Sequence, residues 1–299
     1  MDEIKTYNNI FLFGEILYDC FEDGTTVLGG APFNVAWNLK GLELNPIVVS
    51  SIGHDSYGKS AQEAFIKWRL DTQYIKQEPL LSTGKVSISL DTQGVPSYKI
   101  EEKSAYDYLE FHSDIPDNSI LYHGSLAFRY PHNLQVLQQL KRNKNISLFV
   151  DVNLREPYWG KSSLDIILPN TTWLKLNSHE LRDIERIYRP NSTMIKHLFH
   201  KYNIQKIILT HGENGATIYS NDGYQISATP PTPSSLIDTV GAGDAFSAVC
   251  LYGILHNWSD KLILQRASEF ASKSCSNRGA ITTDKEFYLS TLQGWKNAK

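Results

Sequence analysis

Short runs of β-branched and aromatic residues alternate with segments of helical periodicity, and this alternation constrains the fold more than any other feature of the chain. The expected strands are residues 9–19, 46–53, 119–125, 146–153, 172–177 and 206–212. In the segment before the fourth strand, Leu134, Leu137 and Leu140 recur at the spacing of one helix face. Strands and helices that alternate in this way form a mostly parallel sheet with helices on both faces. We therefore expect a doubly wound α/β fold.

Residues 85–101 break the alternation. Val86, Ile88 and Leu90 alternate with serines, and a second alternating stretch follows the turn sequence at 91–94. This pattern predicts an antiparallel hairpin with one covered face. The hairpin can belong to a small β-sheet flap that covers a substrate or a partner subunit. Alternatively, it is a simple edge hairpin of the main sheet.

Charge and composition narrow the expected partners to small molecules. The 299 residues contain 29 Lys+Arg and 32 Asp+Glu, so we expect neither nucleic acid nor an anionic membrane as a partner. We predict a cytoplasmic protein, because there is no signal-like N-terminus and no apolar run of about 18 residues. Cys20, Cys250 and Cys275 are far apart and lack metal-ligand spacing, which favours free thiols.

A glycine-containing turn near the C-terminus is the most informative local feature. Gly241, Ala242 and Gly243 directly precede an apolar helical run. Unpaired N–H groups and the helix dipole make such a helix start an anion site. Asp244, within this donor group, can accept a proton from a hydroxyl that approaches a phosphate, as phosphoryl transfer requires. Alternatively, the small residues allow close helix packing and Asp244 caps the helix. The turn alone leaves both interpretations open.

Two strings resemble the signatures of one protein family. DTVGAGDAF at 238–246 closely resembles the C-terminal signature of the PfkB, or ribokinase-like, carbohydrate kinases, and GGAPFNVAWNL at 29–39 resembles their N-terminal signature. The resemblance covers essentially the whole chain and implies a single kinase domain over residues 1–299. It also implies a ribokinase-like fold whose small β-sheet lid comes from parts of about 14–30 and 84–110. Such a kinase would transfer the γ-phosphoryl group of ATP to a sugar hydroxyl and would form a homodimer through the lid.

The resemblance also implies which residues carry the reaction and bind the acceptor. Asp244 corresponds to the catalytic base, and the amides of Gly241, Ala242 and Gly243 correspond to the anion hole. The acceptor sugar would be bound by Asp19, Gly30, Asn34 and Arg155.

Further positions are implied for the nucleotide and for cations. ATP and its phosphates would be held by Asn177, Glu180, Thr210, Gly212 and Gly215, with Mg²⁺ bound to Glu180 through water. A monovalent cation, K⁺, would be bound by Asp238, Val240, Ser274, Asn277, Gly279 and Thr283. By itself, Glu180 can equally be a first-turn helix residue, and residues 212–215 can be an ordinary turn.

Several segments resemble the fructokinase-like branch of the family. Residues 83–109 resemble its lid segment, with Tyr106 in place of the usual Trp, and 151–159 resemble a segment that would bring Arg155 near the substrate or the phosphates. Fructose is therefore the expected acceptor and fructose 6-phosphate the product. Arg155 and Arg129 can instead serve the carboxylate of 2-keto-3-deoxygluconate. Phe33, where alanine is commoner, is expected to place a ring close to the sugar pocket. A ribokinase-type or nucleoside kinase, or a non-catalytic sugar sensor on the same fold, is also compatible with the two signatures.

Overall fold

A mostly parallel sheet forms the centre of the computed structural model, which describes residues 5–90, 96–231 and 235–297. The predicted turn at 91–94 lies outside these residues. The strand order in the main sheet is β13 (Gln225–Ala228), β12 (Ala216–Ser220), β11 (Lys206–Thr210), β10 (Trp173–Asn177), β9 (Ser147–Asp151), β8 (Ser119–His123), β1 (Asn9–Phe13), β4 (Ile47–Gly53) and β5 (Ile75–Glu78). Neighbours from β5 to β11 run parallel, whereas β12 and β13 are antiparallel. The predicted fold class is confirmed.

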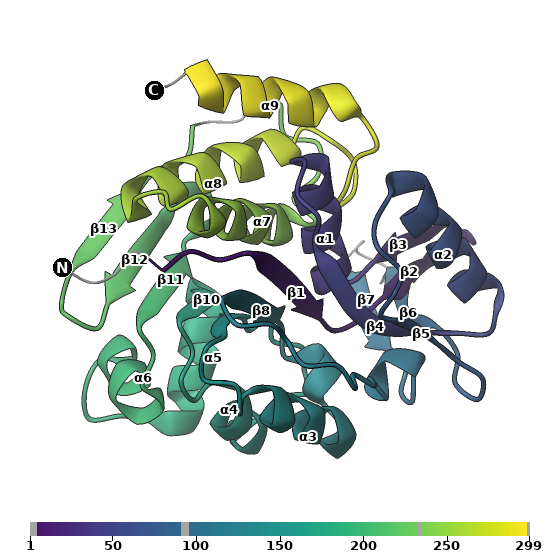
Figure 1. Cartoon of the computed structure of the whole chain (residues 1–299), viewed down its shortest axis with the longest axis horizontal. Coiled ribbons are helices and arrows are strands. Elements are labelled where there is room, and N and C mark those ends of the chain that lie inside the picture. The colour runs from purple at the N-terminus through teal and green to yellow at the C-terminus, as the bar shows by residue number, and fades with distance from the viewer. Residues whose placement is uncertain (1–4, 91–95, 232–234, 298–299) are drawn as a thin grey trace.

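Helices cover both faces of this sheet (Figure 1). One face carries α1 (Ala31–Gly41), α2 (Ser56–Trp68), α7 (Ala242–Leu255), α8 (Asp260–Ser274) and α9 (Lys285–Asn297). The other carries α3 (Pro131–Leu140), α4 (Lys161–Ile167), α5 (Ser178–Tyr188) and α6 (Met194–Tyr202). The strands are buried between two apolar layers, which explains why they appear in the sequence as short apolar runs.

The predicted first strand, 9–19, is two strands in the structure. The chain leaves the main sheet after β1 and enters a second sheet as β2 (Leu17–Phe21). At Gly14, between them, φ is 149°, and a Cβ would lie 2.6 Å from Pro32 Cγ in α1. Only glycine avoids this contact, so the chain bends here while the apolar sequence continues.

A small second sheet lies beside the main one. Its strand order is β3 (Thr26–Gly29), β2, β6 (Gly84–Leu90) and β7 (Pro96–Ile100). β6 and β7 form the predicted antiparallel hairpin, and β2 runs parallel to β6. The hairpin therefore belongs to a separate sheet, near α2 in Figure 1, and the interpretation as an edge hairpin of the main sheet is wrong.

The strand order places a topological switch point between β1 and β8. From β1 the chain continues to β4 and β5 on one side, whereas β8 to β11 extend on the other. Open α/β sheets bind ligands outside the carboxyl ends of their strands at such a point. Asp151, Asn177 and Thr210 are the last residues of β9, β10 and β11, so these side chains are brought to the same edge of the sheet.

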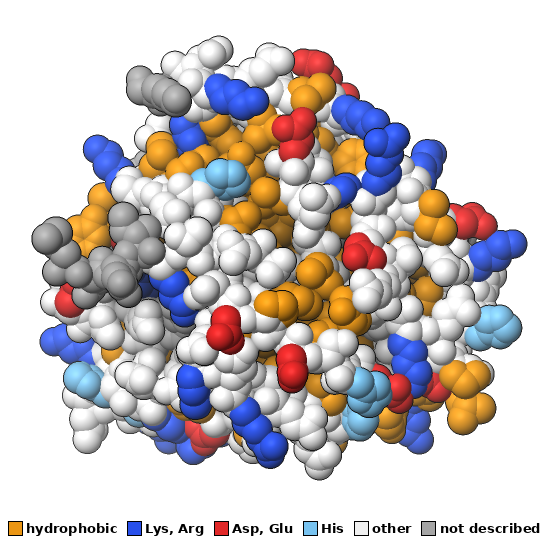
Figure 2. Space-filling view, in the orientation of Figure 1, with side chains coloured by type: hydrophobic (Ala, Val, Ile, Leu, Met, Phe, Trp, Pro, Cys, Tyr) orange, Lys and Arg blue, Asp and Glu red, His pale blue; other side chains and the backbone are white. Residues whose placement is uncertain are grey.

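On the face of the molecule drawn in Figure 2, Lys and Arg side chains are interspersed with Asp and Glu side chains. Within the described ranges, none of the helices combines the length and the apolar character needed to span a bilayer.

Candidate active site

The glycine turn and α7 form the centre of the candidate site. Gly241, at the N-cap, has a φ of 76°, and a Cβ there would collide with the Cβ of Ala280. The N–H of Ala242 donates to the Thr239 carbonyl (3.2 Å). The N–H groups of Gly241 and Gly243 have no backbone acceptor among the described residues. These two N–H groups at the start of a helix can bind an anion.

Asp244 is hydrogen-bonded across the molecule to the other end of the chain. Asn34 Nδ2, in α1, donates to Asp244 Oδ2, in the first turn of α7, at 2.8 Å. The two sequence signatures therefore meet. Burial raises the pKa of Asp244 to about 6, although the bond from Asn34 lowers it, and the nearby Asp151 raises it further. Asp244 thus makes a tertiary contact that a simple helix cap would not need.

A second acidic side chain, Glu15, lies at this site and was not among the residues predicted from the sequence. Only 2% of the residue is exposed, and its Oε2 has no hydrogen-bond partner in the part of the chain that the structure describes. Burial raises the pKa of Glu15 to about 7, and Asp244 contributes to the rise. The sequence feature that indicates Glu15 is a carboxyl group between apolar residues just after the first strand. The prediction used Asp19, in the same segment, instead.

Asp19 and Arg155 face the same region from two different elements. Asp19, in β2, pairs with Val86 of β6. Burial raises the pKa of Asp19, while the positive charge of Arg155 lowers it. Arg155 is exposed, in the loop after β9, and its charge also acts on Glu15 and Asp244. The structure therefore brings these predicted acceptor residues together.

Gly30 is the N-cap of α1 and packs directly on Glu15. Its φ is 109°, and a Cβ would collide with the Glu15 carbonyl oxygen. The Gly30 carbonyl accepts the N–H of Asn34 at 2.9 Å, which starts the helix. Glycine at this position lets the α1 N-terminus approach the end of β1.

Lys175 ties the anion turn to the sheet and was also missed. It lies opposite Asp151 in the β9–β10 register, and its Nζ donates to Asp151 Oδ2 at 2.7 Å. The same Nζ donates to the Gly243 carbonyl at 3.2 Å, and Ser247 Oγ also donates to Asp151 Oδ2 at 2.7 Å. Burial alone would lower the pKa of Lys175, but attraction to Asp151 outweighs it and the pKa is raised.

Asn177 and Glu180 form a capping box at the start of α5. Asn177 Oδ1 accepts the N–H groups of His179 and Glu180, and Glu180 Oε2 accepts the N–H of Asn177 at 2.8 Å. Glu180 Oε1 accepts the N–H of Leu154 at 3.0 Å. Both residues thus have a structural role at the first turn of a helix, as Glu180 by itself suggested. Burial raises the pKa of Glu180, with a further contribution from Asp151.

The donor set around Glu180 fits a hydrated cation better than one bound by protein alone. The described residues hold no cluster of three or more His, Cys, Asp or Glu that could bind a metal. Mg²⁺ commonly keeps several waters and takes its other ligands from one or two carboxylates and substrate phosphates. One carboxylate at the carboxyl edge of the sheet is compatible with that mode.

The predicted nucleotide loop is the turn between β11 and β12. Thr210 ends β11 beside Asn177, and residues 212–214 form a single 3₁₀ turn. A Cβ at Gly215, where φ is 96°, would collide with the Ala228 carbonyl oxygen. The glycines therefore shape a hairpin, and Gly212 is exposed at its tip.

The predicted cation segments lie side by side. The carboxylate of Asp238 accepts the N–H of Val240 at 3.0 Å and that of Gly279 at 2.8 Å. The Ser274 carbonyl accepts the N–H of Asn277 at 2.9 Å. The two loops are thereby joined beside the anion turn.

The side chains of Phe33 and Arg129 are both buried against other residues. Phe33 is fully buried and packs on Trp37 and Phe65, with ring centroids 5.5 and 5.3 Å apart. Successive helix residues point about 100° apart, so Asn34 faces α7 while Phe33 faces α2. Arg129 donates to both carboxylate oxygens of Asp107 at 2.7 Å and is 1% exposed as a side chain. Its charge is therefore already paired.

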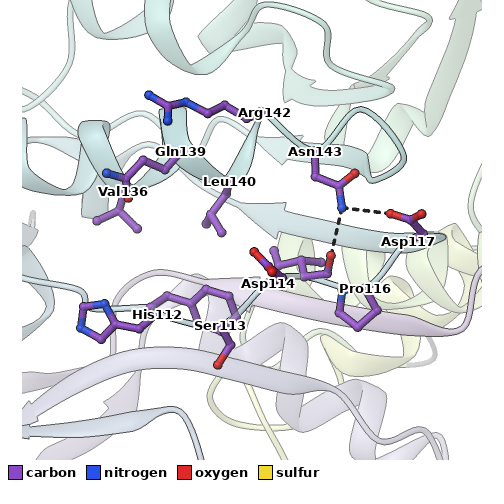
Figure 3. A pocket seen from close by; sticks show the side chains of 12 residues that line it. His112, Ser113, Asp114, Pro116, Asp117, Val136, Gln139, Leu140, Arg142 and Asn143 are labelled. Carbon is purple, nitrogen blue, oxygen red and sulfur yellow. Dashed lines mark hydrogen bonds between the residues drawn. The ribbon is translucent and has the colours of Figure 1, made fainter.

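A pocket of about 810 Å³ lies far from the candidate site, at the amino ends of the strands. It is formed between residues 111–117 and the end of α3 (Figure 3). Asn143 Nδ2 donates there to the Ile115 carbonyl and to Asp117 Oδ1, at 3.0 and 3.1 Å. Residues 111–117 precede β8, so the pocket is at the amino ends of the strands. None of the candidate site residues lines it.

A doubly wound sheet with an anion turn and a buried carboxylate at its carboxyl edge offers groups that phosphoryl transfer requires. Residues 13–286 match the pfkB family carbohydrate kinase, and the chain belongs to this family. It is accordingly a phosphotransferase with a sugar hydroxyl as acceptor.

Its relatives carry several substrate names. The chain is 29% identical to a putative sugar kinase of Pyrococcus horikoshii, over 86% of this chain and 84% of the relative. It is 26% identical to a 5-dehydro-2-deoxygluconokinase of Clostridium botulinum, over 83% and 77%. Identity to a fructokinase of Klebsiella pneumoniae is 25%, over 95% of both chains.

Solved structures support the fold. The sugar kinase of Pyrococcus horikoshii superposes with a TM-score of 0.76 at 24% identity, covering 96% of this chain and 99% of the other. A fructokinase of Xylella fastidiosa with bound ATP gives a TM-score of 0.79 at 18% identity, with the same coverage.

Proposed function

We propose that this protein transfers the γ-phosphoryl group of ATP to fructose and produces fructose 6-phosphate. The observation that carries the proposal is the 2.8 Å hydrogen bond from Asn34 to Asp244. It joins the predicted acceptor-binding helix, α1, to the helix whose N-terminus offers an anion site. The proposed base, the anion site and the proposed acceptor-binding groups would then act together, beside the small sheet that contains Asp19.

In the proposed reaction Asp244 accepts the proton of the acceptor hydroxyl. The hydroxyl oxygen forms a bond to the γ-phosphorus, the bond from that phosphorus to the bridging oxygen breaks, and ADP leaves. The N–H groups of Gly241 and Gly243 stabilise negative charge on the transferred group. Asn34 holds the carboxylate of Asp244 in place, and Lys175 holds the turn through the Gly243 carbonyl.

The proposal includes the predicted cofactors and assembly. Glu180 would hold Mg²⁺ through water near the ATP phosphates, where the ion would neutralise their charge. K⁺ would lie between the loops joined by Asp238. Dimerisation through the small sheet is supported by the exposed apolar side chains of Phe21, Val27 and Tyr98, at 41%, 39% and 63% exposure. We propose a cytoplasmic location on the sequence argument alone.

Local charge favours a neutral sugar over a sugar acid. Three carboxyl groups, on Glu15, Asp19 and Asp244, surround the charge of Arg155, and Arg129 is paired with Asp107. A substrate carboxylate would meet these acids at close range. A sugar acid is the second candidate, because Arg155 is exposed and one relative is named a 5-dehydro-2-deoxygluconokinase.

We expect fructose to give the highest kcat/KM with ATP. The comparison set is tagatose, ribose, inosine, 2-keto-3-deoxygluconate and 5-dehydro-2-deoxygluconate, measured by ADP release in a coupled assay. A higher kcat/KM for either sugar acid would overturn the assignment of fructose. Absence of ADP release with every compound would favour a non-catalytic sensor.

We expect kcat/KM to decrease as the pH falls through about 6, because Asp244 is then protonated and cannot accept the hydroxyl proton. The raised pKa places this loss above the range of an ordinary aspartate. The profile should be measured from about pH 5 to about pH 8 with the coupling enzymes in excess. A flat profile over that range would contradict the role of Asp244 as base.

A further inference from the structure

Glu15 occupies the position where the fold itself provides a ligand site. It follows β1 by two residues and therefore lies at the switch point between β1 and β8. The N-terminus of α1 packs against it, since a Cβ at Gly30 would be 3.3 Å from Glu15 Cγ. Burial raises the pKa of Glu15, and the backbone N–H groups of Glu15 and Ala31 have a smaller, opposite effect.

Charged and titratable groups face Glu15 from several elements. Asp244 of α7 raises its pKa and Arg155, after β9, lowers it. Tyr106, in the 3₁₀ turn at 105–107, and Tyr122 of β8 are close enough for the charge of Glu15 to raise their own pKa values, after burial. Both tyrosine hydroxyls, like Glu15 Oε2, are buried without a hydrogen-bond partner in the described ranges.

An unpaired carboxylate oxygen is costly in a buried position, so native structures rarely leave one without a partner. The acceptor in the proposed reaction is a polyol. A hydroxyl both donates and accepts, and it can therefore pair with Glu15 in either protonation state.

We propose that Glu15 is a further acceptor-binding residue, whose free Oε2 pairs with one hydroxyl of the sugar and selects for acceptors that carry it. The inference rests on the proposed function as a sugar kinase, but not on the identity of the sugar. A site built to pair with a hydroxyl rejects an analogue that lacks it, because the buried polar group is then left unpaired.

The test combines Glu15→Gln and Glu15→Ala with deoxy analogues of the best acceptor. Glu15→Ala is expected to raise the acceptor KM by about ten- to a hundred-fold and to leave the ATP KM unchanged. Wild type should bind one deoxy analogue far more weakly than the parent sugar, and this difference should disappear in Glu15→Ala. Glu15→Gln preserves the shape and should keep part of the discrimination.

A second readout is the pH profile of kcat/KM. The pKa of Glu15, about 7, lies above that of Asp244, so Glu15 is already neutral where Asp244 titrates, and the acidic limb should stay near pH 6 in Glu15→Gln. Glu185→Gln, on the exposed surface of α5, is the matched control and should change neither measurement.

Parallel increases in both KM values together with a lower melting temperature would show a structural role and overturn the proposal. Unchanged discrimination among all deoxy analogues would overturn it as well. If wild type prefers tagatose or another sugar, the assignment of fructose fails, and the Glu15 test is run with that sugar. Calorimetric titration of wild type and the variants with the acceptor and its deoxy analogues measures the same discrimination as binding affinity, without turnover.

Discussion

Replacing Asp244 with asparagine is expected to reduce kcat by about 10²–10⁴-fold. The amide keeps the size of the side chain, but it cannot accept the proton of the acceptor hydroxyl. ATP should bind with nearly the wild-type affinity, because the N–H groups of Gly241 and Gly243 are unchanged. Steady-state kinetics and calorimetric titration with a non-hydrolysable ATP analogue measure the two effects separately.

The control for this variant is Asp222→Asn, on the exposed turn between β12 and β13, which should retain full activity. Near-normal turnover in Asp244→Asn would show that another group takes the proton. Combined loss of ATP binding and turnover would instead indicate that the anion turn had rearranged.

Replacing Lys175 with methionine is expected to lower the free energy of unfolding by about 3–5 kcal/mol. The substitution leaves Asp151 buried with Ser247 as a remaining donor, and it removes the bond that holds the Gly243 carbonyl. Equilibrium unfolding in urea, followed by far-UV circular dichroism, measures the change. kcat should fall as well, since the anion turn loses its attachment to the sheet.

Two further variants test whether the loss of stability comes from the unpaired buried charge of Asp151. Lys161→Met breaks the exposed pair with Asp165 and should cost far less, because water screens that pair. Adding Asp151→Leu to Lys175→Met should recover much of the stability, since it removes the unpaired buried charge. A single Lys175→Met variant as stable as wild type would refute the account.

The fold could be predicted from the sequence because its strong signals are local. Apolar strands, helical periodicity and an alternating hairpin each need only neighbouring residues. The break at Gly14 could not be predicted in the same way, because it depends on how closely Pro32 of a later helix approaches. The apolar residues on both sides of Gly14 and Glu15 made residues 9–19 resemble one strand and concealed the change of sheet.

The candidate site was predicted in part. Asp244, Asn34 and Asp19 stand out in motif-like strings, and the structure brings Asn34 and Asp244 into contact. Glu15 and Lys175 were missed because their importance arises from burial, and the packing of Phe33 on Phe65 could not be predicted because a motif position does not give the direction of a side chain. Their roles in turnover stay predictions for the experiments above.

The contact between Asn34 and Asp244 joins residues separated by 210 positions, so it can form only late in the synthesis of the chain. When the ribosome has completed β13, every described strand of the main sheet exists, but neither the base nor helices α7 to α9 have been made. Strands β12 and β13, against which α8 packs in the finished protein, would still be uncovered on that face, and with them the buried side chain of Ile218. The proposed base and the cover of these strands are therefore synthesised together, within residues 242–274.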